Sequence, residues 1–300
     1  MSRVVQRPLL AFALALAAVG ALSIMDAVMK HLVLALGVFA VSVWRSLINL
    51  AFASALYLPR HGAWPTRATP RLHVARALLT TVMALLFFWG IARVPLAQAI
   101  ALTFIAPLIA LLLAAVTLDE RIGPRSIIGS LLAFLGVLTI FLGQATTDLG
   151  SDALWGSAAI LGSAICYAIN IVMMRQQAMA AGPREINFFQ NVVVAAVWLG
   201  AVVVMGAPAW PAGQVGWLVV AAMLSTSGML LFAFAYARAE ASYLAVTEYS
   251  AFLWAAALGW LVFQEPVSNY TLAGVVLIIA GCLVAARAEA RIPGEVEVAT

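Results

Sequence analysis

Charged residues are scarce in this chain of 300 residues: 9% are Asp, Glu, Lys or Arg, whereas 65% are hydrophobic. A soluble domain carries about a quarter charged residues, because charges cover the surface that faces water. The shortage therefore excludes a soluble protein and predicts an integral membrane protein. A bilayer admits helices or closed barrels, since every backbone polar group must find its partner within the protein. The apolar runs are continuous for about twenty residues, which predicts helices rather than the alternating strands of a barrel.

Residue types that perform chemistry are scarce as well. The two cysteines, Cys166 and Cys282, fall inside apolar runs, and the three histidines have no metal-ligand spacing. We therefore expect no disulfide, no metal and no cofactor. The chain lacks the H-E-x-x-H and G-x-S-x-G motifs and has no carboxylate pair within one predicted helix. An integral membrane enzyme would need such a convergent set, so the sequence argues against an enzyme.

Ten apolar segments follow one another along the chain, separated by breaks rich in Gly, Pro and charge. We predict membrane-spanning helices at residues 8–30, 34–58, 74–92, 96–118, 124–143, 153–174, 187–206, 213–236, 241–263 and 270–287. The N-terminus imitates a signal peptide, but its apolar run continues from Pro8 to Met29, which is long enough for a retained spanning helix.

One stretch occurs twice, at residues 92–138 and 237–283, and the two copies align without a gap. The informative matches are Arg93 with Arg238, Glu120 with Glu265, Gly129 with Gly274, and Gly136 with Gly281. Matches of these residue types at one offset predict a duplicated half, with one repeat at residues 1–147 and the other at 148–300. Because each half holds five segments, an odd number, the second half enters the membrane from the opposite side. We therefore predict an all-α fold of ten transmembrane helices in a 5+5 inverted-topology repeat, which suits alternating access.

The basic residues are divided unequally between the two sides of the predicted membrane. With the N-terminus inside, thirteen of the 16 Lys and Arg lie on the inner side, two on the outer side, and Arg45 within a segment. Because cytoplasmic loops carry the excess, we expect both termini to be cytoplasmic in a bacterial-type inner membrane. Five tryptophans stand at predicted outer ends, where their rings prefer the interface: Trp89, Trp155, Trp210, Trp217 and Trp260.

Three charged residues lie inside the first two segments. Asp26 and Lys30 stand four residues apart, either as a local ion pair that lowers the burial cost of both or as a gate or substrate anchor. Arg45 lies near the middle of the second segment and needs a partner. Asp26 is the nearest plausible acid because the two segments form a hairpin, and we favour a structural pair there.

Other polar residues inside the bilayer predict a substrate cavity between the halves. Ser163, Tyr167 and Asn170 form a polar stripe on the sixth segment that we expect to face the bundle interior. Glu248 is the main candidate to contact a substrate amine or a transported proton, and the alternative is a carboxylate wetted at the nearby interface. The predicted substrate-binding residues are Thr81, Trp89, Tyr167, Asn170, Ser225, Glu248 and Tyr249.

The fifth and tenth segments carry paired glycines and almost no polar groups, which predicts helices that pack closely rather than line a cavity. Glu120 and Glu265 precede them, and we expect each to oppose the dipole of the helix that follows it. Pro107 is predicted to kink the fourth segment.

Ten segments, a duplicated half and the pattern from Leu118 to Gly136, L-D-E followed by two spaced glycines, resemble the EamA family of the drug/metabolite transporter superfamily. The second copy, from Phe263 to Gly281, is similar. The resemblance implies a basket-like helical fold, a central cavity lined by segments 1, 3, 4, 6, 8 and 9, and export of amino acids or other metabolites. Trp89, Tyr167 and Tyr249 are compatible with its aromatic-amino-acid exporter branch.

We hypothesise a secondary transporter that exports aromatic or neutral amino acids, or related small metabolites, by alternating access. An exporter of drugs or cationic compounds is the alternative. A receptor would carry a soluble signalling domain, and the longest predicted loop is too short for one; a channel suits an inverted repeat less well than a carrier does. The expected partners are a small-molecule substrate and the lipid bilayer, with no nucleic acid despite a net charge of +4. The expected assembly is a monomer or a weak homodimer.

Overall fold

The structure is a computed structural model that describes residues 8–60, 69–117, 124–145, 150–236, 238, 244 and 247–289. Every regular element in this described part is helical. The elements are α1 (Pro8–Leu36), α2 (Val38–Tyr57), the 3-10 turn η1 (Leu58–Arg60), α3 (Thr69–Ile91), α4 (Leu96–Thr103), α5 (Ala106–Thr117), α6 (Pro124–Ala145), α7 (Gly150–Ala180), α8 (Pro183–Met205), α9 (Val215–Tyr236), α11 (Ser250–Phe263) and α12 (Asn269–Glu289).

Six of these helices, α1, α2, α3, α7, α8 and α9, are long and apolar enough to cross a membrane. Four shorter apolar helices complete the set, at Leu96–Ala110, Ile127–Gly143, Ser250–Phe263 and Asn269–Val284. The prediction of an all-helical, multi-pass membrane protein is thereby confirmed. Eight predicted segments each correspond to one described helix, although α1 and α7 run several residues beyond the predicted ends. The segment 96–118 is divided into α4 and α5, and in the segment 241–263 the described helix, α11, begins at Ser250.

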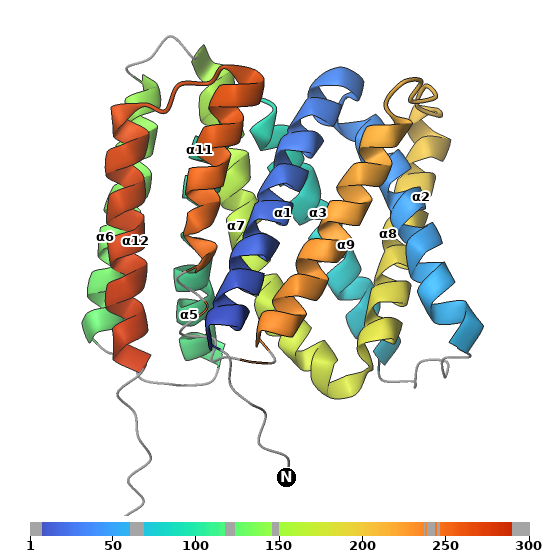
Figure 1. Ribbon diagram of the computed structural model, residues 1–300, viewed down its shortest axis with the longest axis horizontal. Coiled ribbons are helices and arrows are strands. Elements are labelled where there is room, and N and C mark those ends of the chain that lie inside the picture. Colours follow the sequence, from blue (N-terminus) through green and yellow to red (C-terminus); the bar gives the residue numbers. More distant parts are fainter. Residues whose placement is uncertain are drawn as a thin grey trace, which may run out of the picture.

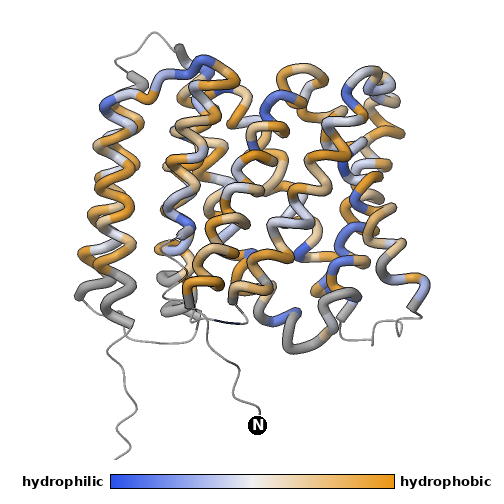
Figure 2. The backbone as a smooth tube through the Cα atoms, viewed as in Figure 1, coloured by the Kyte–Doolittle hydropathy of each residue, from blue (hydrophilic) through white to orange (hydrophobic). Residues whose placement is uncertain are grey.

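The helices stand side by side, with α6 and α12 at one edge of the bundle and α2 and α8 at the other (Figure 1). We call the end where α1 begins and α12 ends the terminal face, and the opposite end the distal face. Hydrophobic residues predominate along α6 and α12, and hydrophilic ones mark the distal connection between α11 and α12 (Figure 2). The tryptophans predicted at outer ends lie toward the distal face, and four of them are exposed: Trp155, Trp210, Trp217 and Trp260.

Glycines let α6 and α12 approach until their backbones touch, as the sequence predicted for these helices. A Cβ on Gly136 would lie 2.6 Å from the carbonyl oxygen of Gly274, and a Cβ on Gly281 would collide with the carbonyl oxygen of Gly129. In the alignment of the two copies, Gly136 corresponds to Gly281 and Gly274 corresponds to Gly129. The contact of Gly136 with Gly274 therefore has its counterpart in the contact of Gly281 with Gly129. The α6–α12 interface is therefore reciprocal.

The helical segment is interrupted between α4 and α5, close to Pro107. Proline lacks an N–H and is tolerated in the first turn of a helix but not in its interior; here α4 ends at Thr103 and α5 begins at Ala106. The predicted kink is confirmed as a full break. The Cys282 thiol donates to the Phe104 carbonyl oxygen at 3.4 Å, and the Tyr249 ring packs edge-on against Phe104 at 5.5 Å. Side chains from α12 and the start of α11 thus cover the broken turn.

Candidate functional site

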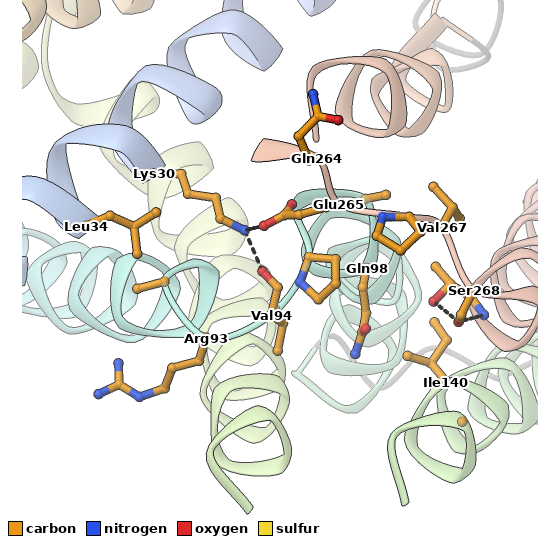
Figure 3. A pocket seen from close by; sticks show the side chains of 16 residues that line it. Lys30, Leu34, Arg93, Val94, Gln98, Ile140, Gln264, Glu265, Val267 and Ser268 are labelled. Atoms are coloured by element: carbon orange, nitrogen blue, oxygen red, sulfur yellow. Dashed lines mark hydrogen bonds and ion pairs between the residues drawn. The ribbon is translucent and has the colours of Figure 1, made fainter. Parts of the chain in front are cut away.

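A partly buried ion pair joins α1 to the α11–α12 connection at the distal face. The Lys30 ammonium, only 2% exposed, donates to Glu265 Oε1 and to the carbonyl oxygen of Val94 at 2.7 Å. The second carboxylate oxygen of Glu265 accepts the Leu96 N–H at 2.8 Å. One carboxylate therefore binds a lysine from α1 and the first turn of α4 (Figure 3). We call Lys30, Val94, Leu96 and Glu265 the distal latch.

Local backbone geometry explains why Glu265 reaches this position. Gln264 adopts a left-handed conformation with φ of 57°. Its N–H bonds the Trp260 carbonyl oxygen at 3.1 Å, as in the αL ending of a helix, and the Glu265 N–H bonds the Gly259 carbonyl oxygen at 3.0 Å. At the other side, Pro95 precedes α4 without a side-chain cap, which leaves the first N–H groups of α4 in need of an acceptor. Glu265 supplies it from the far end of the chain.

Two sequence predictions need correction at the latch. Glu265 was expected to oppose the dipole of the helix after it, but α12 begins at Asn269 and is capped by Ser268, whose Oγ accepts the Thr271 N–H at 3.1 Å. For Lys30, the first of the two alternatives, a local ion pair with Asp26 one turn away on α1, is not what the structure shows. The partner of Lys30 is Glu265, because Lys30 points into the packed connection while Asp26 lies a turn deeper. Glu120, the counterpart of Glu265 in the first repeat, lies outside the described residues.

A cavity of about 480 Å³ opens beside the latch. Its walls come from α1, the α3–α4 connection, α6 and the α11–α12 connection, and Lys30, Gln98 and Glu265 are among its polar lining residues (Figure 3). Gln98 in α4 donates to Ser157 Oγ in α7 at 3.2 Å. The cavity therefore lies at the distal face, where helices of both predicted halves meet.

Asp26 and Arg45 face the interior one turn below the latch. The Arg45 guanidinium stacks over the Phe88 ring at 5.1 Å, and its Nε atom is buried with no hydrogen-bond partner. Asp26 and Arg45 interact electrostatically. Within the described part of the chain, however, the ion pairs within 4.0 Å are Lys30–Glu265 and His73–Glu185. The predicted Asp26–Arg45 pair is thus not an ion pair within 4.0 Å, although both residues are described.

A second polar cluster ties α3 to α7 nearer the terminal face. Arg76, 8% exposed, donates from Nε to Asn170 Oδ1 at 2.8 Å and from Nη1 to Gln177 Oε1 at 2.6 Å. The Gln177 amide also contacts His73 Nδ1 at 2.8 Å, and His73 Nε2 contacts Glu185 at 3.3 Å. From the sequence, Arg76 is one of the thirteen basic residues on the predicted inner side. Arg76 lies one helical turn from His73 on α3, and Gln177 lies two turns from Asn170 on α7. This spacing was the signal in the sequence that these side chains share a face of each helix.

Three of the predicted substrate-binding residues lie close together. Glu248 and Tyr249 directly precede α11, and the charge of Glu248 acts on Tyr249 and on Tyr167 in α7. Glu248 and Tyr167 are both exposed. The members of the polar stripe on α7 have different partners. Ser163 donates to the Met83 carbonyl oxygen at 2.9 Å, and Asn170 accepts from Arg76. Two of its members therefore bind α3.

The remaining predicted residues lie apart from that group. Thr81 bonds the Ala77 carbonyl oxygen of its own helix at 2.8 Å, and Trp89 is covered by the Arg93 guanidinium at 3.6 Å near the distal face. Ser225 is partly buried in the middle of α9. The cavity at the latch contains Lys30 but none of the seven residues predicted to bind substrate.

Comparison with known proteins shows which family the chain resembles. The model of the EamA-like transporter family matches the chain twice, at residues 9–142 and 154–287. The pseudopaline exporter CntI of Pseudomonas aeruginosa is 28% identical over 88% of this chain and 92% of that protein. A riboflavin transporter of Vibrio cholerae is 25% identical over 81% of each chain, and an S-adenosylmethionine uptake transporter of Rickettsia felis is 26% identical over 86% of each. A crystal structure of a protein 18% identical in sequence shares the fold, with a TM-score of 0.60 over 94% of this chain and 99% of that one.

Proposed function

The chain belongs to the EamA-like transporter family, and we propose that it exports an aromatic or neutral amino acid, or a related small metabolite, by alternating access. Family membership implies a small-molecule substrate and a membrane environment, and makes the protein a transporter rather than an enzyme. The proposal adds the substrate class, the direction and the mechanism.

The reciprocal α6–α12 contact is the observation that carries the mechanism. Under the repeat offset, α6 corresponds to α12, α1 to α7, and α3 to α9. The contact of Gly136 with Gly274 is repeated by that of Gly281 with Gly129, and the packing of α1 on α9 is matched by that of α7 on α3. These paired contacts support an inverted repeat of residues 1–147 and 148–300. Such repeats move substrate by rocking one repeat against the other, so that a central site opens to each side of the membrane in turn.

The distal latch fits the same mechanism as a closing contact. Lys30 belongs to the first proposed half and Glu265 to the second, and Glu265 returns to the first half by capping α4. Opening the distal face would require these bonds to separate. When the distal face is open, water can hydrate the separated charges, because a lysine near a helix end reaches the interface. The pair can therefore be released and formed again in each transport cycle.

The substrate class rests on the polar and aromatic groups inside the bundle. The transmembrane segments carry charges of both signs and aromatic rings, namely Glu248 with Tyr167 and Tyr249, and Asp26 with Arg45. Such charges must be kept away from lipid. Aromatic faces add about 1 kcal/mol each for a stacked ring or cation. The relatives include one named as an exporter and one named for uptake, so the direction of transport must be measured.

Transport in proteoliposomes tests the proposal. The purified chain should exchange labelled L-phenylalanine or L-leucine across the bilayer, with riboflavin and S-adenosylmethionine as comparison substrates, in the presence and absence of a pH gradient. Exchange of an amino acid above that of empty liposomes is the expected result. Exchange of riboflavin or S-adenosylmethionine alone would reject the amino-acid assignment, and no flux of any compound would reject the proposal.

A further inference from the structure

We infer that His73 is a proton-binding site near the terminal face, and that a proton on its Nδ1 atom weakens the contact of α3 with α7 while it strengthens the contact of α3 with α8. The inference goes beyond the proposed function, because it assigns a site to a ligand, the proton, that no choice of transported substrate supplies. We call the five connected polar residues the terminal network: His73, Arg76, Asn170, Gln177 and Glu185.

The terminal network joins both proposed halves of the chain at one end of the bundle. His73 lies in the second turn of α3, Gln177 in the last turn of α7 and Glu185 in the first turn of α8. The connection from α7 to α8 lies at the terminal face (Figure 1). A change in these hydrogen bonds therefore changes how α3, from the first half, is held by two helices of the second half.

The amide of Gln177 can be oriented in only one way. Arginine has five N–H donors and no acceptor, so the Gln177 atom that Arg76 Nη1 approaches at 2.6 Å must be the carbonyl oxygen. The Gln177 Nε2 group is therefore the one that faces His73 Nδ1 at 2.8 Å. Because an amide NH₂ group donates and does not accept, the Nδ1 atom must be the acceptor of this bond and carries no hydrogen.

The same geometry fixes the position of the ring hydrogen on His73. A neutral imidazole with a bare Nδ1 has its hydrogen on Nε2, and this atom lies 3.3 Å from Glu185 Oε1. The ring also stacks on Phe189, with centroids 5.7 Å apart, and only 2% of His73 is exposed. The three contacts from Arg76 through Gln177 and His73 to Glu185 thus all run from a donor to an acceptor.

A proton added to Nδ1 makes these contacts incompatible. The imidazolium ion donates from both nitrogens, so its Nδ1–H and the Gln177 NH₂ group would be two donors facing each other. If the amide rotates to offer its oxygen to His73, its NH₂ group faces Arg76, which cannot accept. In either orientation Gln177 keeps one of its two bonds and a buried donor of α3 loses its partner, which destabilises the α3–α7 contact.

Glu185 gains strength as a partner when Gln177 loses it. Once the imidazole is charged, its contact with the Glu185 carboxylate becomes an ion pair. Arg76, on the same helix, opposes a second positive charge. The charge of Glu185 also acts on Tyr57 in α2. The arginine side chains on α7 and α8 near this site lie outside the described residues: Arg175 and Arg184. The two bonds of His73 therefore respond to a proton in opposite directions.

Nitrogen NMR of labelled histidine side chains tests the protonation of His73 directly. Replacing His31 and His61 by Gln leaves His73 as the only one of the three histidines and leaves the terminal network intact. At pH 8 the spectrum should show the tautomer with hydrogen on Nε2. Toward pH 5 both nitrogens should become protonated, since histidine changes charge in this range. The other tautomer at pH 8, or no protonation down to pH 5, would overturn the inference.

Gln177→Leu tests the α7 side of the exchange. The variant should lower the unfolding midpoint in detergent relative to the parent protein at the same pH, and this loss should be smaller at pH 5 than at pH 8. The parent has by then already lost one of the two Gln177 bonds. Gln190→Leu is the matched control, because Gln190 in α8 donates to Thr80 in α3 at 3.1 Å and neither group titrates. Its loss should be the same at both pH values.

A double-mutant cycle of His73→Phe with Glu185→Gln tests the α8 side. The non-additive part of the two midpoint shifts should be larger at pH 5 than at pH 8. A cycle that does not change with pH, or a Gln177→Leu loss that is equal at both pH values, would show that the network does not respond to a proton. None of these measurements involves transport, so the inference can fail while the proposed function stands, and the proposed function can fail without it.

Discussion

Glu265 binds Lys30 although 235 residues separate them in the chain, and the same carboxylate caps the helix that begins at Leu96. Three segments that are remote in sequence therefore meet at one side chain. The two roles of this carboxylate can be separated by mutation.

Glu265→Gln keeps an acceptor for the Leu96 N–H but removes the charge, whereas Glu265→Leu removes both. Loss of one partner of a buried ion pair costs about 3–5 kcal/mol, and loss of a helix cap about 1 kcal/mol more. We expect thermal unfolding in detergent to rank the stability as parent, Gln, then Leu. Equal stability of the two variants would show that the cap contributes nothing.

Gly136→Ala and Gly281→Ala should already impair folding, and the Leu substitutions more so. Each added Cβ meets a backbone carbonyl oxygen of the partner helix, at 2.6 Å for Gly136, and backbone cannot yield as a side chain can. Gly200→Ala in α8 is the control, because nothing lies within 4 Å of its Cβ and helix propensity favours Ala by about 1 kcal/mol. Expression and unfolding midpoints should fall for the first two and hold or rise for the control. Normal stability of Gly281→Ala would contradict the close packing.

Arg76→Lys should destabilise the α3–α7 contact despite keeping the charge. An ammonium cannot reproduce the fork that donates to Asn170 and Gln177, so one buried amide oxygen loses its partner at a cost of about 1–3 kcal/mol. Arg71→Lys, exposed near the start of the same helix, should leave the unfolding midpoint unchanged. A midpoint for Arg76→Lys that equals the parent's would mean that the fork is dispensable.

Both termini should be cytoplasmic, because thirteen of 16 basic residues fall on that side in the ten-helix arrangement. A green fluorescent protein fused to the C-terminus should fluoresce, and alkaline phosphatase at the same place should be inactive. The opposite pair of results would invert the predicted orientation.

Glu248→Gln should lower transport of substrates with a charged amine while leaving expression intact. Its carboxylate is within electrostatic reach of Tyr167 and Tyr249, and it can attract a cationic group that moves between the halves. The measurement is the transport rate of purified protein between pH 5 and 8. A rate equal to the parent's throughout that range would make Glu248 a structural residue.

The sequence by itself determined the membrane, the helices and the close-packed glycines. The bilayer leaves an apolar chain no alternative to internal backbone hydrogen bonds, so composition and run length suffice to place helices such as α2 and α8. The interruption of the fourth segment near Pro107 has an equally local cause, because proline lacks the backbone N–H that a helix interior requires. Gly136 and Gly281 were recognisable because they recur at one offset and contact backbone, whose position the helix already fixes.

Only the tertiary structure decided which polar groups meet. Lys30 has an acid one turn away in Asp26, yet it binds Glu265, because helix packing brings the α11–α12 connection over the end of α1 and buries the lysine there. Asn170, which the sequence predicts as a substrate-binding residue, accepts a hydrogen bond from Arg76. Periodicity shows which face of a helix is polar, but the partner of that face depends on the relative rotation and depth of two helices. Those quantities are set by the whole packed bundle, and no local pattern in the sequence contains them.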